Sequence, residues 1–321
     1  MKNKMKILLC GILMVCLTAC GNATTKEHFE ATNTQGTEIR EESSAYKSIE
    51  ISSGVVGSDA ENMTFQYNGE PIRFTYEWQT NETCKMGLKL YVEGIEQSYS
   101  VGGKETTLYT ENVVGNKATR FDVAFTPNIG KPGDTVNLLF ANIYEPNILE
   151  LSKQGTILFG NNQKISSPLF WHIQMNEDNK HEPEVGRIKE LSSTVVSQEE
   201  KDNKYIQKDN SGNLRNKLTH MTFELSQDDK VITDAILDGN KETRVRVLGG
   251  QEGDYRLSLH RNFEVSESED ATYYDFHQEK DGCTELRIPR DWLQSGENFY
   301  IMAIQTGEGS DWQKSNSFCI R

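Results

Sequence analysis

The chain has 321 residues and carries 34 Lys and Arg against 48 Asp and Glu, a formal net charge of −14 at pH 7. This acidic balance disfavours nucleic acid and anionic lipid headgroups as partners, because both repel negative charge. The length is about twice that of an ordinary domain, so we expect two domains, each able to bury a hydrophobic core.

The N-terminal residues have the features of an export signal. Three lysines lie within residues 1–6, and residues 7–17 are apolar apart from Gly11. This apolar stretch is too short for a membrane-spanning helix, which needs about 20 apolar residues. We therefore interpret residues 1–19 as a removable signal peptide.

The segment Leu17-Thr18-Ala19-Cys20 resembles the lipobox of bacterial lipoproteins. The resemblance implies that diacylglycerol is joined to the Cys20 thiol, that the chain is cut before Cys20, and that lipid holds the protein at the extracytoplasmic face of the cell membrane. An ordinary secretory signal is the alternative. Loss of residues 1–19 removes three lysines, which leaves 31 basic against 48 acidic residues and a net charge of −17.

Residues 20–45 read as a flexible tether behind the lipid anchor. The stretch is rich in Thr, Glu, Ser and Asn, and Phe29 and Ile39 are its only large apolar residues. It cannot bury enough apolar surface to fold. A flexible chain of this length spans about 25–30 Å.

Beyond the tether, polar and apolar residues alternate with the period of β-strands. The clearest examples are residues 72–78, 88–92, 121–125 and 245–247, and further strands are predicted at residues 136–143, 169–173, 255–259 and 299–304. Turn signals such as Asn68-Gly69 and Asp238-Gly239 lie between them. We predict an all-β fold with two tandem immunoglobulin-like β-sandwich domains, at residues 46–178 and 187–321, joined by a hinge at residues 179–186.

Four short matches between the two halves suggest a tandem duplication. The matched pairs are residues 51–56 with 191–196, 63–65 with 221–223, 121–134 with 284–297, and 167–170 with 316–318. Changes in the offset predict polar, loop-like insertions at about residues 202–217 of the second copy and 144–163 of the first. Loops carry most recognition, so these insertions are where the copies should differ in function.

Three cysteines remain as thiols in the mature chain, Cys84, Cys283 and Cys319. Outside the cytoplasm one pair and one single thiol is the simplest arrangement, so a Cys283–Cys319 disulfide is possible. There is no CxxC motif for redox chemistry or zinc.

The sequence contains no motif for catalysis. The six histidines form no metal-ligand spacing, and GxSxG, P-loop and dinucleotide-binding motifs are absent. Calcium is a weaker possibility, because acidic groups at residues 228–229, 234–240 and 267–270 supply oxygen ligands. Among the aromatic residues, Trp312, Tyr273 and Tyr274 are possible ligand-binding residues, since exposed rings stack on sugars or anchor partners.

We therefore expect a membrane-anchored binding module of the cell envelope that does not catalyse a reaction, with an envelope protein or glycan as partner and no cofactor beyond the lipid on Cys20. An enzyme acting on envelope glycans, or its carbohydrate-binding accessory, is one alternative. The other is a structural stalk or assembly factor with an exposed edge strand.

Overall fold

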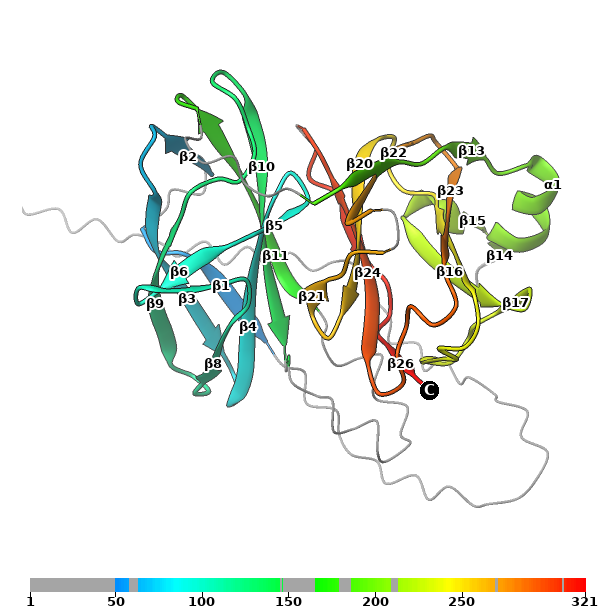
Figure 1. The fold of residues 1–321 in the computed structure, drawn as a ribbon, viewed down its shortest axis with the longest axis horizontal. Helices are drawn as coiled ribbons and strands as arrows, with labels where there is room; N and C mark the ends of the chain where they lie inside the picture. The colour runs from blue at the N-terminus through cyan, green and yellow to red at the C-terminus, as the bar shows by residue number, and fades with distance from the viewer. Residues whose placement is uncertain are drawn as a thin grey trace, which may run out of the picture. The chain divides into compact units, whose positions relative to one another are not determined.

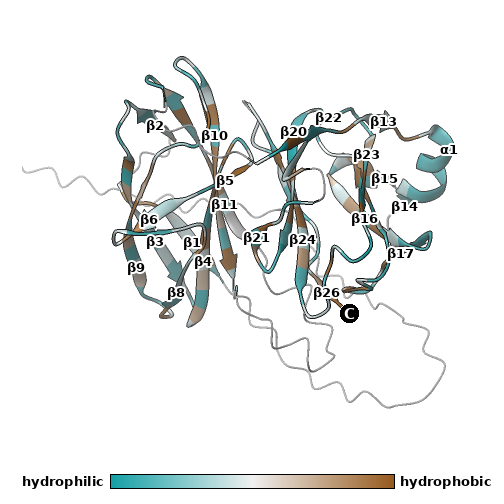
Figure 2. Ribbon diagram, in the orientation of Figure 1, coloured by the Kyte–Doolittle hydropathy of each residue, from teal (hydrophilic) through white to brown (hydrophobic). Residues whose placement is uncertain are grey.

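Among the residues that the structure describes, almost all regular structure is β-strand, arranged in four large sheets and one two-stranded sheet (Figure 1). The computed structural model describes residues 50–57, 63–144, 146, 165–178, 186–208, 213–268, 271–307 and 309–321. Residues Ser48–Arg321 form one compact unit. Apolar residues follow the strands, whereas α1 is hydrophilic (Figure 2). In the described part of the chain, no helix has the length and hydropathy needed to cross a bilayer.

Two sheets, A and B, form the first sandwich. Sheet A contains, in spatial order, β1 (Ile51–Val55), β3 (Ile72–Thr80), β9 (Ala118–Phe125), β6 (Tyr99–Val101) and β7 (Lys104–Thr106). Sheet B contains β2 (Thr64–Tyr67), β11 (Ile165–Met175), β10 (Thr135–Tyr144), β4 (Cys84–Val92) and β5 (Ile95–Gln97), and β8 (Tyr109–Val113) also pairs with β4.

The core of this sandwich is rich in aromatic residues. The stacked rings of Tyr76 and Phe140 join the two sheets, with their centroids 5.3 Å apart. Trp78 is fully buried beside them, and its indole Nε1–H donates to Asn142 Oδ1 at 2.7 Å. The apolar residues of the alternating segment 72–78 therefore face this core.

Two further sheets, C and D, form the second sandwich. Sheet C contains β12 (Ile188–Glu190), β22 (Tyr273–Gln278), β20 (Gly253–Arg261), β24 (Asn298–Gln305), β26 (Phe318–Ile320) and β18 (Ile236–Leu237), with β21 (Glu264–Val265) beside β20 and β25 (Trp312–Lys314) beside β24. Sheet D contains β13 (Ser193–Val195), β23 (Gly282–Ile288), β19 (Thr243–Leu248), β16 (Thr222–Gln227) and β17 (Lys230–Val231).

Both sandwiches have immunoglobulin-like strand order, which confirms the predicted fold class. In the first sandwich, sheet A contains the neighbours β1, β3 and β9, and sheet B contains the neighbours β4, β10 and β11. In the second sandwich, the corresponding neighbours are β16, β19 and β23 in sheet D, and β20, β24 and β26 in sheet C. These are the positions of strands A, B, E and C, F, G in that fold. In each sandwich a short strand, β2 or β18, runs parallel to the last strand.

This topology separates the sequence matches into two kinds. Residues 121–125 and 284–288 lie in β9 and β23. Residues 167–170 lie in β11, and residues 316–318 lead into β26, so both pairs occupy equivalent places. The first two matches do not. β1 pairs with β3, whereas β13 pairs with β23; likewise β2 lies beside the last strand of its sandwich, whereas β16 pairs with β19. Short apolar strands resemble one another in composition, so these two sequence matches do not reflect equivalent positions in the fold.

The insertion predicted as a polar loop in the second copy is a folded element. It contains α1 (Gln198–Glu200), a wider helical turn (Lys201–Tyr205), the hairpin of β14 (Ile206–Lys208) and β15 (Leu214–Asn216), and a final turn (Lys217–Thr219). Tyr205 and Leu218 form a small buried cluster with Leu248 and Cys283 of sheet D. Most of the insertion in the first copy, and residues 179–185 of the hinge, lie outside the described residues.

Candidate functional site

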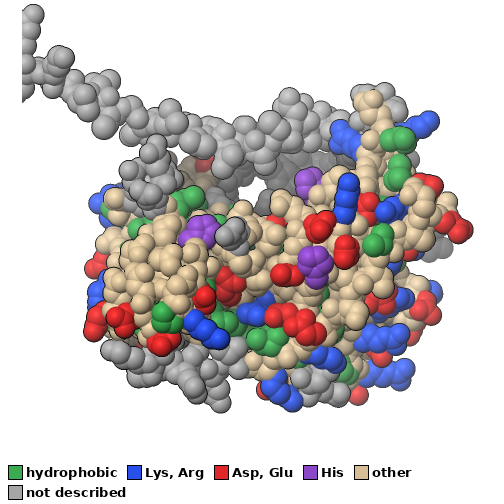
Figure 3. All heavy atoms as spheres, turned by 90° about the horizontal axis from the view of Figure 1, so that it is seen from above, with side chains coloured by type: hydrophobic (Ala, Val, Ile, Leu, Met, Phe, Trp, Pro, Cys, Tyr) green, Lys and Arg blue, Asp and Glu red, His purple; other side chains and the backbone are tan. Residues whose placement is uncertain are grey.

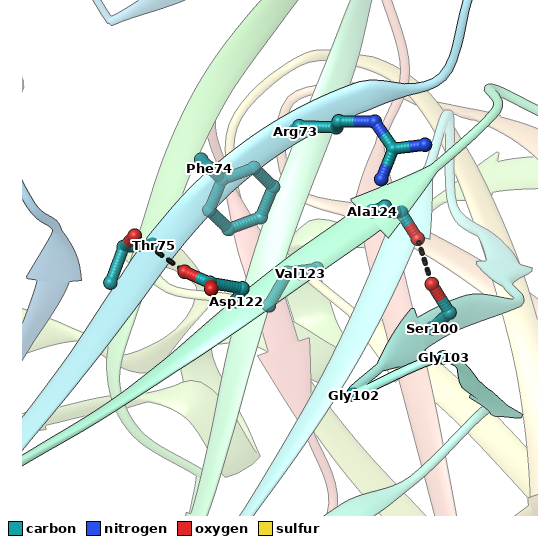
Figure 4. Close-up of a pocket in the computed structure, with 9 residues that line it drawn as sticks. All are labelled: Arg73, Phe74, Thr75, Ser100, Gly102, Gly103, Asp122, Val123 and Ala124. Atoms are coloured by element: carbon teal, nitrogen blue, oxygen red, sulfur yellow. Dashed lines mark hydrogen bonds between the residues drawn. The ribbon is translucent and has the colours of Figure 1, made fainter.

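A groove lies beside β9 on sheet A of the first sandwich (Figure 4). It has a volume of about 500 Å³. Its lining residues come from β3, from β9 and from β6 with its turn, namely Arg73, Phe74, Thr75, Ser100, Gly102, Gly103, Asp122, Val123 and Ala124.

The groove exists because β6 is short. It pairs with β9 only through Ser100 with Ala124 and Val101 with Val123, and the chain then reverses at Gly102-Gly103. Both glycines have positive φ, 58° and 80°, as a two-residue hairpin turn of this kind requires. The rest of the β9 edge therefore has no strand beside it among the described residues.

Strand register sets the chemistry of the groove. Thr75 lies opposite Asp122 and Arg73 lies opposite Ala124 on the paired strands β3 and β9. The Thr75 hydroxyl donates to Asp122 Oδ1 at 2.7 Å, which fixes that carboxylate. The Arg73 side chain is exposed and extends toward Ala124 (Figure 4). No described residue pairs with its guanidinium.

The inner side of the groove is aromatic. Phe74 packs against Phe65, Phe125 and Phe140 of the core, so its backbone position is rigid. The groove thus places an exposed guanidinium, an oriented carboxylate and hydroxyl groups on a fixed sheet. This set can hydrogen-bond the hydroxyls or the carboxylate of a polar ligand.

A second cavity, of about 420 Å³, contains two carboxylates, Glu93 and Asp134. Burial raises the pKa of Glu93. Its two carboxylate oxygens, however, accept the backbone N–H groups of Asn137 at 2.6 Å and Gly307 at 2.9 Å. Because both oxygens are already engaged, Glu93 ties the two sandwiches together and does not favour the glycan-hydrolysing alternative.

The aromatic residues predicted for ligand binding do not form an exposed platform. Tyr273 and Tyr274 are buried, at 4% and 1% exposure. Tyr273 accepts the Glu96 backbone N–H through its hydroxyl, and Tyr274 hydrogen-bonds Ser268. Trp312 is half-buried against the cluster that joins sheets B and C. The prediction treated the strand β22 as a surface loop, because the sequence does not show that Tyr274 lies in the core of its own sandwich or that Tyr273 contacts the other sandwich.

The cysteine predictions have different outcomes. Cys20 lies outside the described residues, so its lipidation stays a prediction. Cys84, Cys283 and Cys319 are free thiols, which corrects the possible Cys283–Cys319 bridge. The physical reason is their placement: Cys283 packs in the buried cluster under the folded insertion, whereas Cys319 lies in β26 of sheet C, between the core residues Phe318 and Ile320.

Some of the acidic groups considered for calcium have basic neighbours. Lys241 lies 2.8 Å from Asp228 and 3.9 Å from Asp238, and Arg187 pairs with Glu267 at 2.7 Å. Residues 269–270 lie outside the described ranges. On the face shown in Figure 3, acidic and basic side chains are interspersed. Sequence reasoning missed Arg73 and Asp122, although both occupy the polar phase of strands that it did predict.

No protein-family model and no curated protein sequence matches the chain. Among solved structures, the E. coli chaperone DraB is 10% identical, with 84% of this chain and 98% of that chain covered and a TM-score of 0.22. The CsuC–CsuE chaperone–tip adhesion subunit complex of Acinetobacter baumannii is 9% identical, with 84% and 98% covered and a TM-score of 0.20. CBD12 from CALX1.2 is 9% identical, with 76% and 77% covered and a TM-score of 0.19.

Proposed function

We propose that this protein is a lipid-anchored binding module of the cell envelope, held at the extracytoplasmic face of the membrane by diacylglycerol on Cys20. The lysine-rich start, the short apolar stretch and the lipobox-like segment support the anchor. The tether gives the sandwiches reach from the membrane, and the groove on sheet A meets the ligand.

Arg73, which pairs with no acidic group among the described residues, lies beside the Thr75–Asp122 hydrogen bond, and this is the observation that supports binding most directly. An exposed guanidinium, an oriented carboxylate and hydroxyl groups around one cavity match the hydrogen-bonding pattern of a glycan that carries hydroxyl and carboxylate groups.

The anchor is tested by fractionating cells that produce the wild-type chain or Cys20→Ala. The wild type should enter the membrane fraction, and mass spectrometry of its N-terminal peptide should show Cys20 with a diacylglyceryl addition. Cys20→Ala should lose the lipid and the cut before residue 20. An unmodified Cys20 in the wild-type peptide would refute the anchor.

The groove is tested with the mature protein and soluble acidic and neutral envelope polysaccharides in equilibrium binding. We expect Arg73→Ala and Asp122→Asn each to weaken binding about tenfold, since each removes a charge-assisted hydrogen bond. Arg290→Ala, an exposed arginine of the second sandwich, is the matched control and should bind as the wild type does. Equal binding by all four proteins would exclude the groove.

A further inference from the structure

One end of the antiparallel pair β20 and β22 carries four metal-ligating side chains on the exposed face of sheet C. Asp254 of β20 lies directly opposite His277 of β22, and Gly253 lies opposite Gln278. Glu252 and Glu279 come next on the two chains, and both are exposed. Cross-strand neighbours two residues apart share a face, so the four side chains project to the same side.

Three of these side chains converge. One ring nitrogen of His277 and one carboxylate oxygen each from Glu252 and Glu279 lie within 4.8 Å of one another. Donors bound to one zinc ion at about 2.0–2.1 Å lie at most about 4.2 Å apart. The two exposed glutamate side chains can close that small difference by rotating.

The fourth side chain orients the imidazole. Asp254 Oδ1 lies 2.7 Å from His277 Nδ1. When neutral His277 carries its proton on Nδ1, this contact is a hydrogen bond and Nε2 presents its lone pair. A carboxylate behind a histidine in this way is the usual outer partner of a metal-bound imidazole, because it fixes the ring and raises its basicity.

Charge on this face also favours a cation. Glu252 and Glu279 face each other at the strand ends, and like charges directly opposite are destabilising. Within the described ranges, neither glutamate forms an ion pair with Lys or Arg.

We propose that Glu252, His277 and Glu279 bind one divalent transition-metal ion of the zinc class, with Asp254 as the positioning residue. An imidazole together with carboxylates suits zinc, whereas calcium and magnesium take oxygen ligands alone. The site lies on the second sandwich, and it does not depend on the groove in sheet A.

The backbone around the site is already ordered. Gly282 N–H donates to the Glu279 carbonyl at 2.8 Å and closes a tight turn. The Asp281 side chain in that turn accepts from Lys201 at 2.9 Å and from Asn216 at 3.2 Å, which anchors the folded insertion. A metal ion bound by Glu279 therefore stabilises the turn that holds the insertion.

The test is calorimetric titration of zinc chloride into the metal-free, full-length mature protein, purified without a histidine tag. We expect one saturable site, which His277→Gln and the double variant Glu252→Gln/Glu279→Gln abolish. His220→Gln, an exposed histidine outside the cluster, is the matched control and should leave the affinity unchanged. Failure to bind zinc at millimolar concentration, or equal zinc binding by His277→Gln, would overturn the proposal.

Two further readouts identify the role of each residue. Asp254→Asn should weaken zinc binding about tenfold while one site remains, as expected for an outer partner. Zinc should raise the Tm of the wild type and of His220→Gln but not of His277→Gln. Calcium that binds at the same site as tightly as zinc and independently of His277 would overturn the assignment of the metal.

Discussion

The guanidinium of Arg256 donates through Nη1 to the backbone carbonyl of Glu93 at 2.9 Å, from the second sandwich to the first. The same group makes two hydrogen bonds of 2.7 Å to the carboxylate of Asp275 on the neighbouring strand β22. Arg256 is 8% exposed. One planar cation therefore links sheet C, Asp275 and the turn at Glu93, a geometry that a lysine cannot reproduce.

Arg256→Ala should destabilise the protein strongly. It leaves the Asp275 carboxylate and the Glu93 carbonyl without their partner, so we expect a loss of about 3 kcal/mol in the free energy of unfolding, measured by urea denaturation. Arg244→Ala is the matched control, because Arg244 pairs with Glu285 on an open surface where both side chains are about 40% exposed. That change should cost less than about 1 kcal/mol, and equal losses in the two variants would contradict this account.

Lys314 should make stability depend on pH. Burial lowers the pKa of Lys314 to about 7 from its ordinary 10.5. Its ammonium group lies 4.4 Å from the centre of the Tyr300 ring, and it donates to the Ser315 carbonyl and the Ser317 hydroxyl. His260 faces the same region, and its pKa is lowered chiefly by burial and also by the charges of Lys89 and Lys314.

Between pH 7 and 10.5 the unfolded chain binds a proton on Lys314 that the folded chain does not. Stability should therefore rise with pH across this window, by about 1.4 kcal/mol per pH unit from this one group. Lys314→Met should remove this contribution to the pH dependence of stability. The difference between the unfolding free energies of the wild type and the variant, measured in urea, should therefore change with pH. A constant difference across the same window would show that the lysine stays charged.

Alternation along the chain was enough to predict the strands, but not their partners. Residues 72–78 and 121–125 show period two, and they form β3 and β9 with their apolar phase inward. The pairing that brings Thr75 opposite Asp122 depends on the whole sheet, so the groove could not be predicted. The two-residue alternation of polar and apolar side chains indicates which face of a strand is buried. Which strand lies next to it depends on the tertiary fold.

Burial explains why Tyr273 and Tyr274 are not exposed rings: Tyr273 faces the first sandwich, and Tyr274 lies in the core of the second. Tyr273 and Tyr274 follow an acidic stretch, which suggested a surface loop. Both rings are instead buried, and Tyr273 hydrogen-bonds the backbone of Glu96 in the first sandwich. The acidic residues at 252, 254 and 279 were not predicted as a site, because only the register of β20 and β22 brings them to His277.

The free thiols can be tested by alkylation. The intact mature protein, analysed without reductant, should have the mass of three free thiols at Cys84, Cys283 and Cys319. Iodoacetamide should modify the half-buried Cys319 before the other two. Burial raises the pKa of Cys283, so its thiol should react only after unfolding. A mass lower by two hydrogens without reductant would show a disulfide and contradict the structure.

Asn142 should be indispensable to the first sandwich. Its side chain is fully buried, its Oδ1 accepts from Trp78 Nε1 at 2.7 Å, and its Nδ2 donates to Ser53 Oγ at 2.9 Å. It also hydrogen-bonds the buried hydroxyl of Tyr76. A polar group in this aromatic core therefore connects β10 of sheet B to β1 and β3 of sheet A.

Asn142→Leu keeps the volume but leaves the Trp78 and Tyr76 donors without an acceptor. Because a buried donor without a partner costs about 1–3 kcal/mol, we expect a loss of about 2–4 kcal/mol in the free energy of unfolding. Asn112→Leu, at an exposed position of β8, should change it by less than about 0.5 kcal/mol. Restoring part of the loss by adding Tyr76→Phe to Asn142→Leu would identify the stranded hydroxyl as a cause, whereas additive losses in the double variant would assign the effect to packing.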